Sequence, residues 1–320
     1  MWILSKIWNT SIELKPERPV TPRAKIWASE LGKSDLDIFL KMMGEAPSNP
    51  PDARANRKFE AGNLFEWIVQ LVLMRSGIYK ESQRWIGNSE FGLDVSGKLD
   101  HVAGGKPKYD LARQEIDSLG LPELFGRATG QILDYFASEY PNGLPEQIIE
   151  VKSTSSFGIE KVYFTGKALA GHDLQAFHYS YNTKIPAMVL YICRDDLRMA
   201  EIPVLSDDQE LLSRYKAKIE SVARYYNQKV EPPKEPMIVY DPNEKKFSKN
   251  FNVEYSQYLK RNYKIETPDE YDEVYGKIVE SFNRVLGRVK EGKEMTDNNL
   301  EKIGRMTEMG FNFEEIKKSL

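Results

Sequence analysis

The chain has 320 residues, of which 41% are hydrophobic and 29% charged, and its formal net charge is −3 at pH 7. Such a composition is typical of a globular protein and excludes a globally basic surface, so a polyanionic partner would need a local concentration of Lys and Arg. The single cysteine, Cys193, excludes an internal disulfide and any four-cysteine zinc or iron–sulfur site within one chain, and it fits a reducing compartment.

The sequence also contains no pattern typical of a membrane-spanning segment, a signal peptide or a zinc site. The strongly apolar run at 68–74 is too short to cross a bilayer, and the opening MWILSKIW lacks the basic leader and long apolar region of a signal peptide. The three histidines, His101, His172 and His178, do not pair at zinc-motif spacing. We therefore expect a cytoplasmic protein with no membrane partner.

The first third of the chain predicts helices followed by short strands. A proline-rich arm at 1–22 precedes a helical pattern at 25–43, in which Ser34 or Asp35 is a candidate cap. A proline-rich loop at 44–53 leads to a second helix at 54–75. Strand-like segments follow at 79–86, 90–96 and 97–103.

The remainder alternates between helical and strand-like patterns. The segments are a mainly helical, polar stretch at 106–146, a strand centred on 148–152, a helix at 167–182, two strands at 187–193 and 199–204 joined by a turn at 194–196, an amphipathic helix at 206–228, a proline-rich then extended stretch at 231–264, and helices to residue 320. This order predicts an α/β fold with a mixed central sheet.

We divide the chain accordingly. The arm at 1–22 precedes a core at 23–205, which contains a helical insertion at 104–146. A helical C-terminal region at 206–320 is expected to pack on the core.

Two strand-like segments carry carboxylates in unusual places. Alternation along the strand puts Glu150 and Lys152 on one face and apolar neighbours on the other. Asp100 lies in the strand-like sequence GKLDHV, where an aspartate is disfavoured unless it is paired or binds a metal. The alternative for Glu150 and Lys152 is a solvated ion pair on an exposed face.

Two helices add further polar candidates. At helical spacing, Glu66 shares a face with Phe59, Gly62, Val69 and Leu73, which predicts a carboxylate on a buried apolar stripe, or alternatively a partly exposed boundary residue. Gln175 and Tyr179 are four residues apart on the helix expected at 167–182, so their side chains should project together, whether as a site or as an ordinary helix face.

These pieces occur in a recognisable order. G-x-x-x-E at 62–66, G-K-L-D at 97–100, E-V-K at 150–152 and Q-x-x-x-Y at 175–179 together resemble the PD-(D/E)xK nucleases, over about residues 25–205. The match is to the RecB-like exonuclease branch, which includes CRISPR-associated and phage-encoded enzymes. The resemblance implies a restriction-endonuclease-like core and a metal-dependent DNA exonuclease that acts on ends in recombination, repair or phage replication, in a bacterial cell or phage-infected host.

The resemblance also implies residue roles. Asp100, Glu150, the carbonyl of Val151 and Glu66 would bind Mg²⁺, with Mn²⁺ as an alternative, and Lys152 would stand beside the attacking water. Gln175 and Tyr179 would steady the site and contact DNA, and with Asp100, Glu150 and Lys152 they make up the catalytic candidates. The expected partners are DNA and a recombination or replication protein. The alternatives are an endonuclease or junction resolvase of the same superfamily, and a protein that binds DNA ends without cutting.

The sequence departs from these relatives in two ways. Many relatives place a histidine where this chain has Glu66, and an all-oxygen site suits Mg²⁺ better. CRISPR-associated relatives carry iron–sulfur cysteines, whereas the corresponding positions here fall near Ser34, Val253 and Ser256, so we expect no iron–sulfur cluster. Aromatic side chains are expected to tie the C-terminal region to the N-terminal helices instead: Phe247, Phe251, Tyr255 and Tyr258.

The insertion at 104–146 is long for a connection between two catalytic strands. Either it decorates the surface, or it forms a lid or wall of a DNA path. We expect it to border the cleft, with phosphates contacted by some of five basic residues in and just before it: Lys98, Lys106, Lys108, Arg113 and Arg127.

Overall fold

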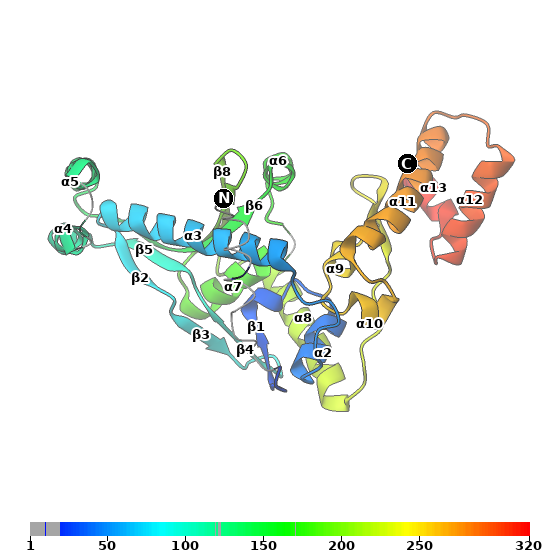
Figure 1. Cartoon of the computed structure of the whole chain (residues 1–320), viewed down its shortest axis with the longest axis horizontal. Helices are drawn as coiled ribbons and strands as arrows, with labels where there is room; N and C mark the ends of the chain where they lie inside the picture. Colours follow the sequence, from blue (N-terminus) through cyan, green and yellow to red (C-terminus); the bar gives the residue numbers. More distant parts are fainter. Residues whose placement is uncertain (1–9, 11–19, 119, 121–122, 170) are drawn as a thin grey trace. The chain divides into compact units, whose positions relative to one another are not determined.

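A computed structural model describes residues 10, 20–118, 120, 123–169 and 171–320, so nearly all of the predicted arm at 1–22 lies outside the described residues. The chain divides into two compact units (Figure 1). The first unit comprises residues 1–44 and 51–231, and the second comprises residues 45–50 and 232–320.

The first unit is built around a five-stranded sheet in the order β2-β5-β6-β7-β8. Its strands are β2 (Tyr79–Ser82), β5 (His101–Gly105), β6 (Leu144–Thr154), β7 (Ala187–Cys193) and β8 (Met199–Val204). The central strand β6 pairs antiparallel with β5 and parallel with β7, so the sheet is mixed. The expectation of a mixed central sheet flanked by helices, with a helical C-terminal region, is confirmed.

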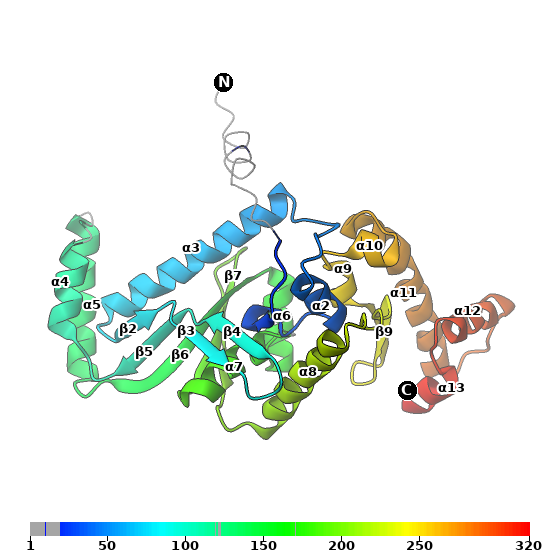
Figure 2. The same ribbon diagram turned by 90° about the horizontal axis from the view of Figure 1, so that it is seen from below.

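Helices cover both faces of this sheet. Figure 2 shows the strands between α3 (Ala53–Arg75) and α7 (His172–Thr183). Alternate residues of β6 point to opposite faces, so Ile149 and Val151 pack in the cluster that contains Val69 of α3, whereas Ile148 packs in the larger cluster that contains Phe177 of α7. Glu150 and Lys152 share the face of Ile148 and therefore point toward the α7 layer.

A second, smaller sheet corrects the helix predicted at 25–43. Residues Lys25–Trp27 form strand β1, which pairs parallel with β4 (Asp94–Lys98), and β4 pairs antiparallel with β3 (Trp85–Asn88). A 3-10 turn, η1 (Ala28–Glu30), leads to the helix α2 (Asp35–Met42). Ser34 caps α2, since its Oγ accepts the Asp37 N–H at 3.0 Å.

Three further boundaries differ from the prediction. The strand expected at 79–86 is β2 and β3, which lie in different sheets and are separated at Gln83, where φ is 57°. The strands expected at 90–96 and 97–103 are β4 and β5. The helix α6 (Ser156–Thr165) was not expected, and it begins directly after β6 because Ser155 accepts the Gly158 N–H at its N-terminus.

The insertion is an enlarged hairpin connection. Gly105 at the end of β5 pairs with Leu144 at the start of β6, so the chain returns to the point where it left the sheet. Between them, α4 (Tyr109–Ser118) and α5 (Glu123–Glu139) are joined by the ion pair between Arg113 and Asp134 at 2.7 Å. The helix α8 (Gln209–Gln228) packs against α2 and α7, which places it in the first unit; the unit boundary therefore follows Glu231 instead of residue 205.

The second unit combines a hairpin with helices. Its elements are β9 (Ile238–Asp241), β10 (Lys246–Lys249), α9 (Phe251–Glu254), α10 (Leu259–Tyr263), α11 (Pro268–Lys290), α12 (Asp297–Glu308) and α13 (Phe313–Ser319). Phe247 and Phe282 lie in its core, with ring centroids 5.2 Å apart. No helix among the described residues combines the length and apolar character that a membrane span requires.

The segment 45–50 belongs to this unit although it lies between α2 and α3 in sequence. The Asn49 N–H donates to the Gln257 carbonyl at 2.9 Å, and the Tyr258 hydroxyl donates to the Glu45 carbonyl at 2.9 Å. Of the four aromatic residues expected to pack here, Phe247 and Tyr258 are buried, but Phe251 and Tyr255 are exposed and contact each other. Backbone and side-chain hydrogen bonds therefore hold this segment, with Tyr258 as the aromatic contributor.

Candidate active site

The sheet register brings Asp100 and Glu150 together. His101 of β5 pairs with Ile149 of β6 in antiparallel register, so Asp100, one residue before β5, lies opposite Glu150. Residues directly opposite each other project to the same face, and Lys152 follows two residues later on that face. Three charged side chains from two distant segments of the chain thus converge where the pairing of β5 with β6 ends.

Hydrogen bonds define their geometry. The Lys152 Nζ donates to the Glu150 Oε1 at 2.6 Å, and the Val151 N–H donates to the Asp100 Oδ2 at 2.8 Å. The N–H and C=O of one residue in a strand point to the same side, so the Val151 carbonyl also points toward the side of Asp100. Glu150 is fully buried, and when it is ionised its Oε2 has no hydrogen-bond donor among the described residues, whereas the protonated carboxyl is placed to donate to Asp100.

Burial and the charges of the neighbouring groups shift the pKa values of all three side chains. Burial, together with the nearby Asp100, raises the pKa of Glu150 to about 8, and burial raises the pKa of Asp100 as well. Burial alone would lower the pKa of Lys152, but Glu150 and Asp100 outweigh it and the pKa is raised. One lysine therefore faces two buried carboxyls, and the site lacks one positive charge when both are ionised.

Glu66 approaches the same group from α3. Burial and Asp100 raise its pKa to about 7, and the ring of His101 contacts its backbone carbonyl at 3.0 Å. Of the face predicted for Glu66, Val69 and Leu73 are buried, whereas Phe59 is 59% exposed. The predicted buried apolar face of α3 is therefore correct at Val69 and Leu73 and wrong at Phe59. The N-terminal part of α3 that carries Phe59 is exposed, whereas the part that carries Val69 and Leu73 packs on the sheet.

Gly62 lies where α3 approaches β6. A Cβ at this position would stand 3.6 Å from the Ser153 Oγ, which is ordinary van der Waals contact. An alanine would therefore fit here, and the approach of α3 to β6 does not require a glycine.

A divalent metal fits part of this donor set. Among the described residues, no group of three or more His, Cys, Asp and Glu side chains is arranged to hold a metal ion. However, Asp100, Glu150 and the Val151 carbonyl offer hard oxygen donors, and the buried Glu150 Oε2 without a partner is a natural ligand atom. Water would complete the coordination shell, as it commonly does for Mg²⁺.

Gln175 and Tyr179 support the strand that carries Asp100. The Gln175 Nε2 donates to the Tyr179 hydroxyl at 3.3 Å, and that hydroxyl donates to the Lys98 carbonyl at 2.8 Å. The two side chains project together, as predicted from their spacing. Both are buried, so in this structure they position the segment from Lys98 to Asp100 instead of presenting a surface to a ligand.

Gly97 makes that arrangement possible. A Cβ there would lie 2.6 Å from the Tyr179 hydroxyl oxygen and 2.7 Å from the Ala28 Cβ, closer than real Cβ contacts. The glycine of the G-K-L-D motif is therefore required by packing.

The basic residues of the insertion lie away from Asp100. Lys106 and Lys108 follow the opposite end of β5, and a five-residue strand spans roughly 16 Å. Arg113 is paired with Asp134. Arg127 also has a partner within the structure. The expectation that this segment borders the cleft is therefore not supported, and Lys98 is the predicted phosphate contact that adjoins the site.

Two residues near the site were missed from sequence. The Arg194 Nη1 donates to the Ser153 carbonyl and hydroxyl, each at 3.3 Å, and the His172 Nδ1 lies 2.9 Å from the Tyr191 hydroxyl. Burial, and then Lys152, lowers the pKa of His172 to about 3, so its imidazole is neutral. Parallel strands end at one edge, so the position of Arg194 directly after the strand at 187–193 could have indicated its place beside β6.

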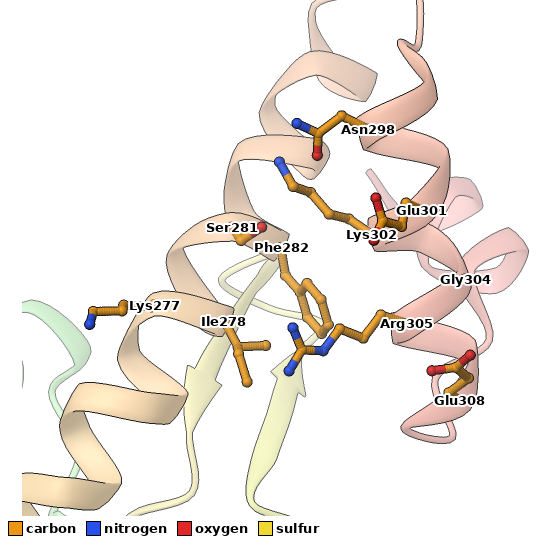
Figure 3. Close-up of a pocket in the computed structure, with 10 residues that line it drawn as sticks. All are labelled: Lys277, Ile278, Ser281, Phe282, Asn298, Glu301, Lys302, Gly304, Arg305 and Glu308. Atoms are coloured by element: carbon orange, nitrogen blue, oxygen red, sulfur yellow. The ribbon is translucent and has the colours of Figure 1, made fainter.

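A pocket lies elsewhere, within the second unit. It has a volume of about 650 Å³ and lies between α11 and α12, as Figure 3 shows. Ile278 and Phe282 contribute its apolar wall, and Lys302 and Arg305 stand opposite. None of the predicted site residues lines it, and we assign the chemistry to the buried carboxyls because they, unlike this pocket, combine burial, charge and an unpartnered ligand atom.

The structure is weakly similar to a few solved structures of other proteins. No family model matches the chain, and no curated protein matches it either. The crystal structure of SSO0001 is similar with a TM-score of 0.39 and 12% identity over 81% of this chain and 95% of that one. LHK-Exo in complex with dAMP is similar with a TM-score of 0.39 and 11% identity over 65% and 90% of the two chains.

A second structure of LHK-Exo, described as an alkaline exonuclease from Laribacter hongkongensis, has a TM-score of 0.36 and 12% identity over 70% of this chain and 97% of that chain. Likeness at this level carries no conclusion about function. The assignment of the site therefore depends on its own geometry.

Proposed function

We propose that this protein is a metal-dependent nuclease that hydrolyses phosphodiester bonds at DNA ends. The observation that carries the proposal is the fully buried Glu150, with an unpartnered Oε2, beside Asp100 and Lys152. An enclosed pair of carboxyls that share one lysine is unfavourable unless it is compensated, and a function that needs a cation accounts for it.

The chemistry requires positive charge at the place where negative charge develops. A bound Mg²⁺ supplies a Lewis acid and lowers the pKa of a coordinated water. Asp100, Glu150 and the Val151 carbonyl would hold it, and Glu66 would contribute a further carboxylate. Ionisation of Glu150 precedes this binding, because its raised pKa leaves it protonated near neutral pH.

Lys152 acts on the substrate side in this proposal. Its Nζ is held by the Glu150 Oε1 and has two further donor protons. Those protons can orient the attacking water or donate to a phosphate oxygen as charge accumulates there. Tyr179 keeps the Lys98 carbonyl in place, and thereby the backbone that leads to Asp100.

The proposal is tested with three DNA forms. End-labelled linear duplex, single strand and closed circle are incubated with the full chain in Mg²⁺, in Mn²⁺ and in chelator. We expect hydrolysis of the linear forms that depends on metal and spares the closed circle. Cleavage of circles would favour an endonuclease or junction resolvase, and DNA binding with no cleavage in either metal would overturn the nuclease assignment.

A matched pair of variants ties the activity to the site. Glu150→Gln should abolish hydrolysis, whereas Glu146→Gln, on the same strand but 40% exposed and paired with Lys80, should leave it unchanged. Equal activity of the two variants would contradict the assignment.

A recombination or replication protein remains the expected protein partner.

Glu66 is tested by metal preference. Imidazole is a softer ligand than a carboxylate, so Glu66→His should shift the ratio of activities toward Mn²⁺. An unchanged ratio would make Glu66 a boundary residue of α3 with no place in the metal site.

A further inference from the structure

The outer face of the sheet β1-β4-β3 carries two tryptophans. Alternation along these strands sends Ile26, Ile86 and Val95 into the core. Trp27 and Trp85 are adjacent to Ile26 and Ile86, and Lys98 lies three residues after Val95, so all three point to the opposite face. The register places Trp27 opposite Ser96 and Trp85 opposite Lys98, on either side of β4. Figure 2 shows β3 and β4 side by side.

The two rings form a compact group with cations. Their centroids are 5.6 Å apart, with 39° between the ring planes. The Lys25 Nζ lies 4.3 Å from the Trp27 ring and 5.9 Å from the Trp85 ring, and the Lys98 Nζ lies 5.1 Å from the Trp85 ring. Trp85 is 55% exposed, so much of a large aromatic surface faces solvent among these lysines. We call Lys25, Trp27, Trp85 and Lys98 the tryptophan platform.

Cation–π attraction alone does not account for this exposure. An exposed cation–π contact contributes only about 0.5–1 kcal/mol, and it can be made by a ring that is otherwise buried. A ring that stays half exposed, next to positive charges, is instead suited to a ligand with both a flat apolar face and a negative charge.

The platform is joined directly to the candidate active site. Lys98 is the last residue of β4, and Asp100 follows two positions later, roughly 7 Å along an extended chain. The Lys98 carbonyl is held by the Tyr179 hydroxyl, which fixes this short link. Only Leu99 therefore separates the platform from Asp100 along the chain.

We infer that the tryptophan platform binds single-stranded DNA beside the active site. This inference rests on the proposed nuclease function. Bases stack on aromatic rings without regard to sequence, and Lys25 and Lys98 would contact the adjoining phosphates. Paired bases within a duplex have both faces covered, so the platform selects a single-stranded or frayed segment.

Binding is measured with the full chain in chelator, so that hydrolysis does not interfere. The probe is a dye-labelled twelve-nucleotide oligothymidylate, followed by fluorescence anisotropy. Loss of one base–aromatic stack should make Trp85→Ala bind about tenfold more weakly, and Trp85→Phe should retain most of the affinity. The matched control is Trp67→Ala, since Trp67 is 66% exposed on α3 of the same unit.

The lysines are tested through the salt dependence. Removing both phosphate contacts in the double variant Lys25→Gln, Lys98→Gln should flatten the slope of log K against log salt by roughly 0.7 per contact. Lys184→Gln is the control, because the Lys184 Nζ also lies over an aromatic ring, at 4.2 Å from that of Tyr181, outside the platform.

A measurement without variants guards against misfolding. Ultraviolet cross-linking of the same oligonucleotide to the unmodified chain, followed by peptide mapping, should place adducts in the peptide that contains Trp85. The inference is overturned if the wild type does not bind the oligonucleotide, or if Trp85→Ala loses no more affinity for it than Trp67→Ala does. It is also overturned if Trp85→Ala loses as much affinity for a blunt duplex as for the oligonucleotide. Platform-dependent binding without hydrolysis would support the platform and refute the nuclease.

Discussion

Toward each end of β6 a glutamate pairs with a lysine, but the two pairs have opposite environments. Near its start, Glu146 pairs with Lys80 of β2, and the two side chains are 40% and 33% exposed. Near its end, Glu150 pairs with Lys152, and the exposures are 1% and 21%. The first pair is solvated, whereas the second is enclosed between the sheet and the α7 layer with Asp100 beside it.

The difference shows that enclosure, and not residue type, perturbs the ionisation of the second pair. Water screens the charges of the exposed pair. In the enclosed pair, desolvation and Asp100 raise the pKa of Glu150 to about 8. The Oε2 of the ionised Glu150 also lacks a hydrogen-bond donor among the described residues. The predictions below test this contrast, beginning with the largest effect.

Removing the two lysines should have very different consequences. Lys152→Met should lower the rate of hydrolysis of linear DNA by about 10²–10³-fold, because a donor aimed at developing negative charge is lost. Lys80→Met should leave the rate unchanged. The measurement is release of end label in Mg²⁺ at matched, subsaturating substrate, and comparable rates for the two variants would contradict the contrast.

The backbone that positions Asp100 should be sensitive to a single methyl group. Gly97→Ala forces its Cβ against Tyr179 and Ala28, so we expect a loss of about 1–3 kcal/mol in the free energy of unfolding. Gly87→Ala in the neighbouring strand is the control, since the nearest atom to its Cβ would be 3.9 Å away. Denaturant titration measures both, and an unchanged midpoint for Gly97→Ala would contradict the packing described for Tyr179.

The enclosed carboxyl should make stability depend on pH when metal is chelated. Between its ordinary pKa of 4.5 and its raised pKa of about 8, folded Glu150 binds more protons than the unfolded chain does. The contribution of Glu150 to stability therefore falls as pH rises through this window, and its full penalty is present above pH 8.

Between pH 7 and pH 9 the fall due to Glu150 should be on the order of 1 kcal/mol, measured in chelator as the difference between the thermal-stability profiles of the wild type and Glu150→Gln, which cannot ionise. The difference is used because burial lowers the pKa of Lys33 to about 8, and this group makes stability rise with pH over the same interval. A difference between the two profiles that does not change with pH would show that Glu150 is ionised in the metal-free protein.

The exposed pair should contribute least. Glu146→Gln should change the free energy of unfolding by less than about 1 kcal/mol, and the change should shrink further at high salt. Chemical denaturation at low and high sodium chloride measures this. A larger effect that resists salt would mean that the two ends of β6 are less different than their exposures indicate.

Local patterns were sufficient for several features of this protein. The strands at 187–193 and 199–204 match β7 and β8, because a continuous apolar run and an alternating segment on either side of a turn specify them locally. The cap at Ser34 and the pairing of Gln175 with Tyr179 follow from spacing along one helix. Alternation along β6 also placed Glu150 and Lys152 on one face.

Features that depend on distant partners required the tertiary structure. Residues 25–27 form a strand, contrary to their helical pattern, because β4 lies almost seventy residues later and supplies the pairing that buries Ile26. The insertion leaves the far end of β5, so Lys106 and Lys108 lie away from Asp100 although they follow it closely in sequence.

The same distinction applies to the candidate site. Sequence alone predicted which carboxyls and which lysine to consider, since residue type and strand alternation are local properties. Whether Glu150 and Lys152 formed an exposed ion pair or an enclosed site depended on the helices packed over β6 and on the antiparallel register that sets Asp100 opposite Glu150. Burial and pairing between distant segments are properties of the folded chain, and they determine the charge state of these side chains.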